Sequence, residues 1–205
     1  MPLDIHYEDP DIFVINKPAG LLSVPGRGEE KYDSVQSRCQ QFAPAAMAAH
    51  RLDMATSGLL LIAKHKAAER HYKQEFAARR VEKRYIAVVH GDIGSDAGDI
   101  EYPLITDWER RPRQKICYQH GKAAHTSYQV LARNGTTTRV ALTPHTGRSH
   151  QLRVHLAAIG HPILGDEFYA EENPPAAPRL LLHAETLAVA NLHGILQRFH
   201  LAPAF

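Results

Sequence analysis

The 205-residue sequence is poor in cysteine: it contains two, Cys39 and Cys117, and they do not form a CxxC pair. Zinc sites of the finger type are built from closely spaced cysteine pairs, so such a site is excluded. A disulfide framework also needs more cysteines than this. We therefore expect both thiols to be incidental groups in a reducing compartment.

Long apolar stretches are absent as well. No run approaches the roughly 18 apolar residues that a membrane-spanning helix needs. The first residues, MPLDIHYEDPDIFVINKP, carry acids early and contain no apolar core of signal-peptide length. These features predict a cytoplasmic protein without a membrane partner.

Neither sign of charge dominates, since 24 lysines and arginines face 22 acids and the formal net charge is +2. Overall charge therefore does not indicate a nucleic-acid partner, and any basic surface must be local. The length and the hydrophobic content of 44% suit one well-buried core. They predict a single domain, in one or two lobes, over residues 1–205.

Hydrophobic patterning predicts many short strands and few helices, which is the α+β class. Asp33 is the expected N-cap of the first helix, and Gly160 is the expected C-cap of the last one. Strands are expected at residues 12–15, 21–24, 59–63, 85–89, 124–131, 137–143, 180–189 and 195–201, and helices at 34–42, 66–79 and 149–159.

The helix over 66–79 has the clearest pattern. Ala68, Tyr72 and Phe76 recur every four residues and so share one face. Glu69 and Lys73 have the i,i+4 spacing of an ion pair.

Polar residues precede the strand over 59–63, in the segment His50-Arg51-Leu52-Asp53-Met54-Ala55-Thr56-Ser57-Gly58. Its ionisable side chains crowd into four positions, which makes the segment a candidate site. An ordinary polar loop would show the same composition.

A second polar segment starts the helix over 149–159, in the order Gly147-Arg148-Ser149-His150-Gln151-Leu152-Arg153. Free amides at a helix N-terminus beside cations attract anions. Capping by Ser149 and a solvated polar face would explain the same residues. Arg153 borders the apolar stripe of the helix, so we expect it to be partly buried with an acidic partner.

Two basic clusters stand out on this nearly neutral chain. One covers residues 79–84; the other follows Trp108 and consists of Arg110, Arg111, Arg113 and Lys115. Basic runs are commonly solvated faces, but a cluster beside an aromatic side chain also suits a surface that follows phosphates.

Motifs of several other chemistries are missing. The sequence has no GxxxxGKS phosphate loop, no GxGxxG, no HExxH and no GxSxG. The 14 histidines are scattered, and His150 and His155 are five positions apart, which is poor spacing for a metal on a helix. We therefore expect no metal site.

Taken together, the polar segments resemble the RluA family of pseudouridine synthases. His50-Arg51-Leu52-Asp53 with Thr56-Ser57-Gly58 is similar to the family's catalytic motif, and residues 147–155 are similar to a later motif. Further matching segments, in the family's order, are Asn16-Lys17-Pro18-Ala19-Gly20-Leu21, Lys83-Arg84-Tyr85, His161-Pro162-Ile163-Leu164-Gly165-Asp166 and Leu181-Leu182-His183-Ala184.

The resemblance runs from about residue 7 to the end of the chain. It implies the family's catalytic fold, a mixed and largely antiparallel bifurcated sheet flanked by helices and loops, without an N-terminal S4-like domain. Residues 23–27 and 108–117 also resemble the family's founding member, which modifies 23S ribosomal RNA and the tRNA anticodon stem-loop. The implied partner is therefore RNA of one or both kinds, bound by a monomer.

The reaction that the resemblance implies is isomerisation of uridine within RNA, without cofactor or metal. Asp53 would be the catalytic carboxylate, acting either as a nucleophile at C1′ or as a base toward a ribose proton. Arg153 would be the cation beside it, and Tyr85 would stack on the uracil. Arg51 would fill the place of the flipped base. Further RNA contacts are expected from Arg148, His150, Gln151, Arg110, Arg111, Arg113 and Lys115.

Two alternatives belong to other functional classes. One is a catalytically inactive RNA-binding module on the same fold, but such a module would have little reason to keep Asp53, Tyr85 and Arg153 together. The other is a small hydrolase, for which the sequence supplies no nucleophilic serine or cysteine beside a base in a recognised arrangement.

Overall fold

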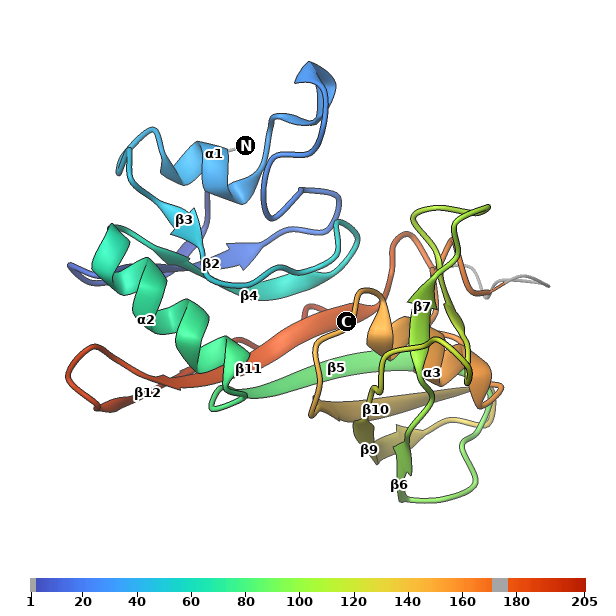
Figure 1. Cartoon of the computed structure of the whole chain (residues 1–205). Helices are drawn as coiled ribbons and strands as arrows, with labels where there is room; N and C mark the ends of the chain where they lie inside the picture. The colour runs from blue at the N-terminus through green and yellow to red at the C-terminus, as the bar shows by residue number, and fades with distance from the viewer. Residues whose placement is uncertain (1–2, 171–176) are drawn as a thin grey trace. The chain divides into compact units, whose positions relative to one another are not determined.

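The computed structural model describes residues 3–170 and 177–205, which form short strands and few helices (Figure 1). The chain divides into a first unit, Met1–Lys83 with His183–Ala204, and a second unit, Arg84–Leu182 with Phe205. It passes to the second unit within strand β5 (Glu82–His90) and returns at the start of β11 (Leu182–Ala190). The single-domain organisation stays a prediction.

The strands of the first unit form a mixed arrangement. β1 (Ile5–Glu8), β2 (Ile12–Lys17) and β4 (Ser57–Ala63) are antiparallel neighbours, and β3 (Met47–Ala48) also pairs with β4. β11 runs parallel to β4 at its start and pairs antiparallel with β12 (Leu196–His200) further on.

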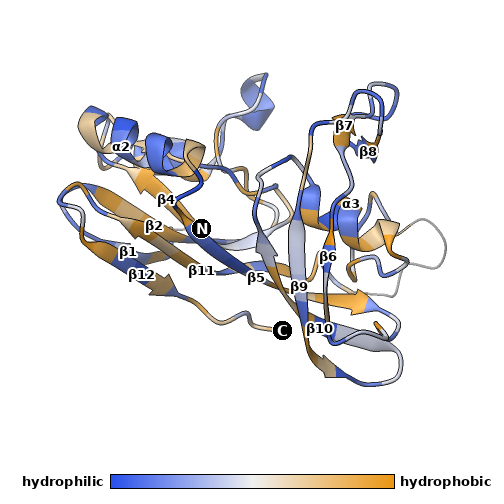
Figure 2. Ribbon diagram, turned by 60° about the horizontal axis from the view of Figure 1, so that its bottom comes forward, coloured by the Kyte–Doolittle hydropathy of each residue, from blue (hydrophilic) through white to orange (hydrophobic). Residues whose placement is uncertain are grey.

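Helix α2 (Lys66–Ala77) lies over strands β2 and β4 in Figure 2 and closes the core of this unit. Ala68 and Tyr72 are fully buried against apolar strand residues, and Phe76 packs at the edge. Glu69 accepts from Lys73 at 2.6 Å. The predicted apolar face and the predicted ion pair are therefore both confirmed.

Two predictions in the first unit are wrong. The first helix is only α1 (Val35–Cys39), and its N-cap is Ser34, whose side chain accepts from the Ser37 amide at 3.1 Å. Asp33 instead bonds Arg38 through both carboxylate oxygens, at 2.7 and 2.6 Å. Residues 21–24 form no strand: Leu22 makes an isolated bridge to Ser34, and the pairing does not extend to its neighbours.

The second unit contains an antiparallel sheet in the order β5, β10 (Thr137–Pro144), β9 (Thr126–Arg133) and β6 (Ala97–Ile100). β7 (Leu104–Thr106) and β8 (Gln114–Ile116) form a separate hairpin. Helix α3 (Gln151–Ala158) packs Val154 against Leu104 and Ala124.

The ends of α3 differ in how well the sequence predicted them. Gly160 follows the helix with φ of 86°, which is the left-handed position expected of a terminating glycine. The N-cap is His150, itself at φ 52°, so the alternative of capping by Ser149 is wrong. Within residues 3–170 and 177–205, none of the helices combines the length and apolar character that a membrane crossing requires.

Candidate active site

Asp53 lies in the loop between β3 and β4, and the backbone on its N-terminal side is fixed by Ser23. The Ser23 hydroxyl donates to the Leu52 carbonyl at 2.8 Å and accepts from the Leu52 amide at 3.0 Å. Ser23 is 3% exposed, so water hardly competes for these bonds. The turn continues with the Thr56 amide donating to the Asp53 carbonyl at 3.1 Å.

Lys17 fixes the other side of the same loop. It ends β2, and its side chain is fully buried. Its Nζ donates to the carbonyls of Pro18, Leu21 and Met54 at 2.8, 2.7 and 2.9 Å. An ammonium has three N–H donors, and these bonds account for all of them. The backbone of Met54, the residue after Asp53, is thus held by the buried amino group of Lys17.

Lys17 also interacts electrostatically with Asp53. Burial lowers the pKa of Lys17 from 10.5 to about 7, and the negative charge of Asp53 opposes that shift. Within the first unit, Lys17 therefore places an amino group with a strongly lowered pKa beside the Asp53 loop. In the sequence, Lys17 stands out only as part of the segment Asn16-Lys17-Pro18-Ala19-Gly20-Leu21, and its burial follows from the fold.

His50 holds the start of the loop in a neutral form. Its Nε2 accepts from the Leu61 amide at 3.1 Å, and its ring stacks on Phe76 at 4.3 Å between centroids. Burial, aided by the positive charge of Lys83, lowers the pKa of His50 to about 3. Arg51, next along the chain, is exposed, and its role toward RNA stays a prediction.

Two segments of the family motifs lie side by side in the fold: Ser57 pairs with His183, and Gly58 with Ala184, across β4 and β11. Gly58 has φ of 110°, and a Cβ there would lie 2.3 Å from the Ala184 carbonyl oxygen, so only glycine fits. His183 accepts from the Ser57 hydroxyl at 2.9 Å through Nδ1 and donates to the Leu201 carbonyl at 3.0 Å through Nε2. These motif residues fix the strand that follows the Asp53 loop.

Arg153 belongs to the second unit, where it is 3% exposed on α3. It donates to both carboxylate oxygens of Asp166, at 2.8 and 2.7 Å, and Asp166 is 1% exposed. Asp166 also accepts from the amides of Phe168 and Tyr169, at 2.9 and 3.2 Å. The expected acidic partner of a buried arginine is therefore present, and it is Asp166. Pairing of Arg153 with Asp53, which lies in the other unit, stays a prediction.

Tyr85 also belongs to the second unit. It lies on β5 opposite Leu142 of β10 and is partly buried. Its stacking on uracil stays a prediction.

Gln151, expected to contact RNA, is 4% exposed and fully hydrogen-bonded within the protein. Its amide nitrogen donates to the His125 carbonyl and to Thr126, both at 2.9 Å. Its oxygen accepts from Thr146 at 2.7 Å and from the Arg148 amide at 3.0 Å. Because an amide side chain makes four such bonds, the structure gives Gln151 a positioning role, and its contact with RNA stays a prediction.

The other two residues of this segment are more accessible. Arg148 is partly buried, and its Nε donates to the Ala123 carbonyl at 3.1 Å. His150 is partly buried and bonds the Tyr169 hydroxyl at 2.7 Å, and its ring stacks on Phe168 at 5.7 Å.

The basic residues 110–115 lie on the β7–β8 hairpin. Arg111 is exposed and stacks on the exposed ring of Trp108, with its guanidinium carbon 3.5 Å from the ring centroid. Arg110 and Lys115 donate to the buried Asp107 at 3.0 and 3.3 Å. These bonds keep the pKa of Asp107 below its ordinary value, although burial, the largest single influence, acts in the opposite direction.

Arg113 completes this group, with its guanidinium carbon 5.8 Å from the centroid of the Phe168 ring. The hairpin therefore carries one arginine stacked on an exposed ring, Trp108, and two further cations held by Asp107.

The chain is similar to known RNA pseudouridine synthases. Residues 11–158 match the family model described as RNA pseudouridylate synthase. The "Dual-specificity RNA pseudouridine synthase RluA" of Haemophilus ducreyi is 55% identical, over 97% of this chain and 92% of the relative. The protein of the same name from Escherichia coli K12 is 54% identical, over 92% of this chain and 87% of the relative.

Two solved structures share the fold of this chain. Human RNA Pseudouridylate Synthase Domain Containing 1 superimposes with a TM-score of 0.85 at 29% identity, over 99% of this chain and 84% of that one. Human RNA Pseudouridylate Synthase Domain Containing 4 superimposes with a TM-score of 0.79 at 26% identity, over 98% of this chain and 89% of that one. The predicted fold class and the predicted enzyme class are confirmed, and the chain belongs to the RluA family of RNA pseudouridine synthases.

Proposed function

We propose that this enzyme isomerises uridines in both 23S ribosomal RNA and the tRNA anticodon stem-loop, with Asp53 as the catalytic carboxylate. The observation that carries the catalytic assignment is the fixing of the Asp53 loop on both sides by buried groups, Ser23 and Lys17. The substrate assignment is supported by relatives at 54–55% identity that are named dual-specificity enzymes. We further propose that the protein acts as a monomer in the cytoplasm, where both RNAs occur.

The reaction rearranges bonds without changing the composition of the RNA. The bond from uracil N1 to ribose C1′ breaks, the base turns, and C5 bonds to C1′ while the proton from C5 leaves and N1 gains one. Asp53 either attacks C1′ or removes a ribose proton, and both roles need an ionised carboxylate at a fixed position. Fixing the backbone on both sides of Asp53 lowers the entropy lost when substrate and carboxylate align.

The target uridine must leave its stack to reach Asp53. Flipping costs a few kcal/mol, and less in a loop than in a duplex, which favours stem-loop substrates. The exposed Arg51, two residues before Asp53, would occupy the vacated place in the RNA. Tyr85 would stack on the flipped uracil, and Arg153 would act toward the carboxylate of Asp53 from a position fixed by Asp166.

The test of substrate choice uses an unmodified tRNA anticodon stem-loop and an unmodified 23S hairpin fragment. Pseudouridine is mapped by carbodiimide labelling and primer extension, and light scattering measures the oligomeric state. We expect modification of both RNAs. Modification of one alone would refute dual specificity, and binding of RNA without modification would favour the inactive RNA-binding module.

Replacing Lys17 with methionine should destabilise the protein and change its pH dependence. Three carbonyls lose their donor, which costs about 1–3 kcal/mol of unfolding free energy. The pKa of Lys17 is about 7 when folded and 10.5 as the ordinary value, so the unfolded chain binds more protons between these limits. The contribution of Lys17 to stability therefore falls as pH decreases from 10.5 to about 7 and is constant below.

Urea unfolding at several pH values measures this effect. The Lys17→Met curve should be flatter than the wild-type curve over that window, and single-turnover rates should fall because the Asp53 loop loses an anchor. Lys122→Met, at a position on the second unit where the side chain is more exposed, serves as the control. If the wild-type and Lys17→Met curves of unfolding free energy against pH run parallel, the lowered pKa of Lys17 in the folded protein is contradicted.

Replacing Arg111 with glutamine should weaken RNA binding without changing the catalytic step. If Arg111 neutralises one phosphate, the slope of log affinity against log salt should become shallower by about 0.7–0.9. Filter binding at several salt concentrations measures the slope. Arg198→Gln is the matched control, since Arg198 is a surface residue of β12 that pairs with Glu82. If the Arg111 variant has the wild-type slope, Arg111 does not contact a phosphate, and the proposal that the hairpin binds RNA is contradicted.

A further inference from the structure

Two histidines that are far apart in sequence lie side by side in the second unit. His125 directly precedes β9 and His145 directly follows β10, one step beyond the last paired residues, Thr126 and Pro144. The His145 amide donates to the His125 carbonyl at 3.0 Å, which continues the ladder. The two rings stack at 4.2 Å between centroids with 22° between their planes.

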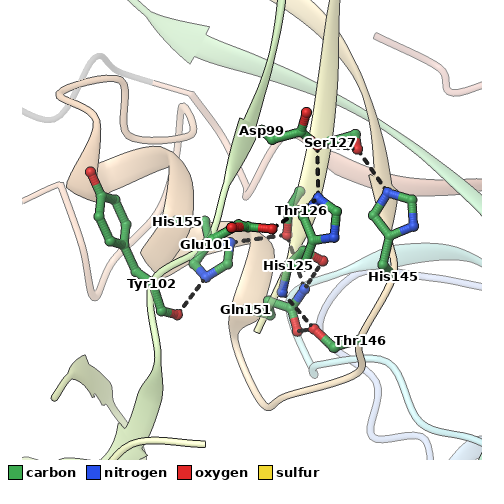
Figure 3. A network of polar contacts seen from close by, with 10 residues as sticks. All are labelled: Asp99, Glu101, Tyr102, His125, Thr126, Ser127, His145, Thr146, Gln151 and His155. Carbon is green, nitrogen blue, oxygen red and sulfur yellow. Dashed lines mark hydrogen bonds and ion pairs between the residues drawn. The ribbon is translucent and has the colours of Figure 1, made fainter. Parts of the chain in front are cut away.

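A carboxylate on the neighbouring strand β6 lies next to this histidine pair. On β6, Asp99 lies opposite Ser127 of β9, and its Oδ1 is 2.7 Å from Nε2 of His125. The Ser127 hydroxyl bridges Asp99 at 2.6 Å and Nε2 of His145 at 2.7 Å. Figure 3 shows the three side chains converging, and one ligand atom from each of Asp99, His125 and His145 lies within 4.8 Å of the others.

We propose that Asp99, His125 and His145 bind a divalent transition-metal ion of the zinc class. Imidazole nitrogens suit zinc, copper and nickel, whereas magnesium and calcium prefer a shell of oxygens. Around zinc, bonds of about 2.0–2.2 Å place tetrahedral ligand atoms ~3.3 Å apart, so this cluster needs only small side-chain movements. Asp99 and His145 are exposed and can make them.

A fourth ligand is within reach. Glu101 directly follows β6, and its Oε1 is 3.9 Å from Nε2 of His125. Its side chain is 71% exposed and is therefore able to turn toward the ion. Two imidazoles with one or two carboxylates, completed by water, form a zinc-type ligand set.

The backbone that carries His125 is held rigidly from the interior. The His125 amide donates to the Thr146 hydroxyl at 2.9 Å, and the His125 carbonyl accepts from the buried amide of Gln151 at 2.9 Å. Thr126 bonds Gln151 at 2.9 Å and His155 at 3.0 Å (Figure 3). Metal ligands are commonly oriented by such a surrounding network, and this one leaves the ring of His125 facing Asp99.

The test titrates the untagged full-length protein with ZnCl₂ by calorimetry and with CoCl₂ by absorption spectroscopy. We expect one ion per chain, a cobalt spectrum without thiolate bands, and no displacement by a millimolar excess of Mg²⁺. Asp99→Asn and His145→Gln should each weaken zinc binding by at least about tenfold, since each removes a direct ligand and the loss of a supporting hydrogen-bond partner alone costs about 10- to 100-fold. His200→Gln, at an exposed histidine of β12, should bind as wild type does.

A second measurement needs no variant. Zinc should protect His125 and His145 from diethyl pyrocarbonate, as peptide mapping of the modified wild-type protein would record. Binding weaker than about 1 mM, displacement by Mg²⁺, or wild-type affinity in both ligand variants would overturn the proposal. The cluster would then be a network of surface hydrogen bonds only.

Discussion

Replacing Asp53 with asparagine is expected to reduce pseudouridine formation by about 10²–10⁴-fold or more, on either RNA. Asparagine keeps the size of the side chain but cannot act as a nucleophile or a base. The fold should survive because the loop is held through backbone groups: Ser23 bonds Leu52, and Lys17 bonds the Met54 carbonyl. Single-turnover primer extension after carbodiimide labelling measures the loss.

RNA affinity separates this effect from a loss of binding. We expect the Asp53→Asn variant to bind both RNAs as tightly as wild type does, or more tightly, since a negative charge near the phosphates is gone. Asp96→Asn is the matched control. The side chain of Asp96 is 90% exposed, and its Oδ1 lies 2.8 Å from the guanidinium of Arg133. Turnover by Asp53→Asn within tenfold of wild type would refute the catalytic assignment.

The elements that the sequence predicted best are those whose signal is local and repeated. Helix α2 buries Ala68 and Tyr72 every fourth residue, and the uninterrupted apolar run of β4 is buried along all of its length. Strands β6, β7 and β8 have four, three and three residues, so they are too short to show an alternation. β7 and β8 are positioned by pairing with each other in a hairpin, and β6 by pairing with β9, and one sequence displays neither pairing.

The candidate sites also differ in whether their residues are contiguous in the sequence or are brought together by the fold. Asp53 stands in a contiguous motif and could be singled out from the sequence. The role of Lys17 depends on carbonyls contributed by Leu21 and Met54, which the folded backbone brings to its ammonium. The group formed by His125 and His145 arises only from the register of two strands, and scattered histidines in a sequence give no hint of it.

The buried pair of Arg153 and Asp166 allows structure and catalysis to be tested separately. Replacing Arg153 alone with methionine leaves the Asp166 carboxylate buried without its counter-ion, and we expect a loss of about 3–5 kcal/mol in unfolding free energy. The double variant Arg153→Met/Asp166→Asn removes both charges, while the asparagine oxygen still accepts from the Phe168 amide. It should therefore be more stable than the single variant.

Turnover by the double variant shows whether Arg153 has a role in catalysis besides binding Asp166. If Arg153 serves only to bind Asp166, the stability regained by the double variant should restore turnover at temperatures where the protein is folded. If it also acts toward Asp53, turnover should stay low in the double variant although urea unfolding shows the recovered stability. Strictly additive losses of stability in the two single variants and the double variant would contradict the ion pair itself, because residues in direct contact are expected to be coupled.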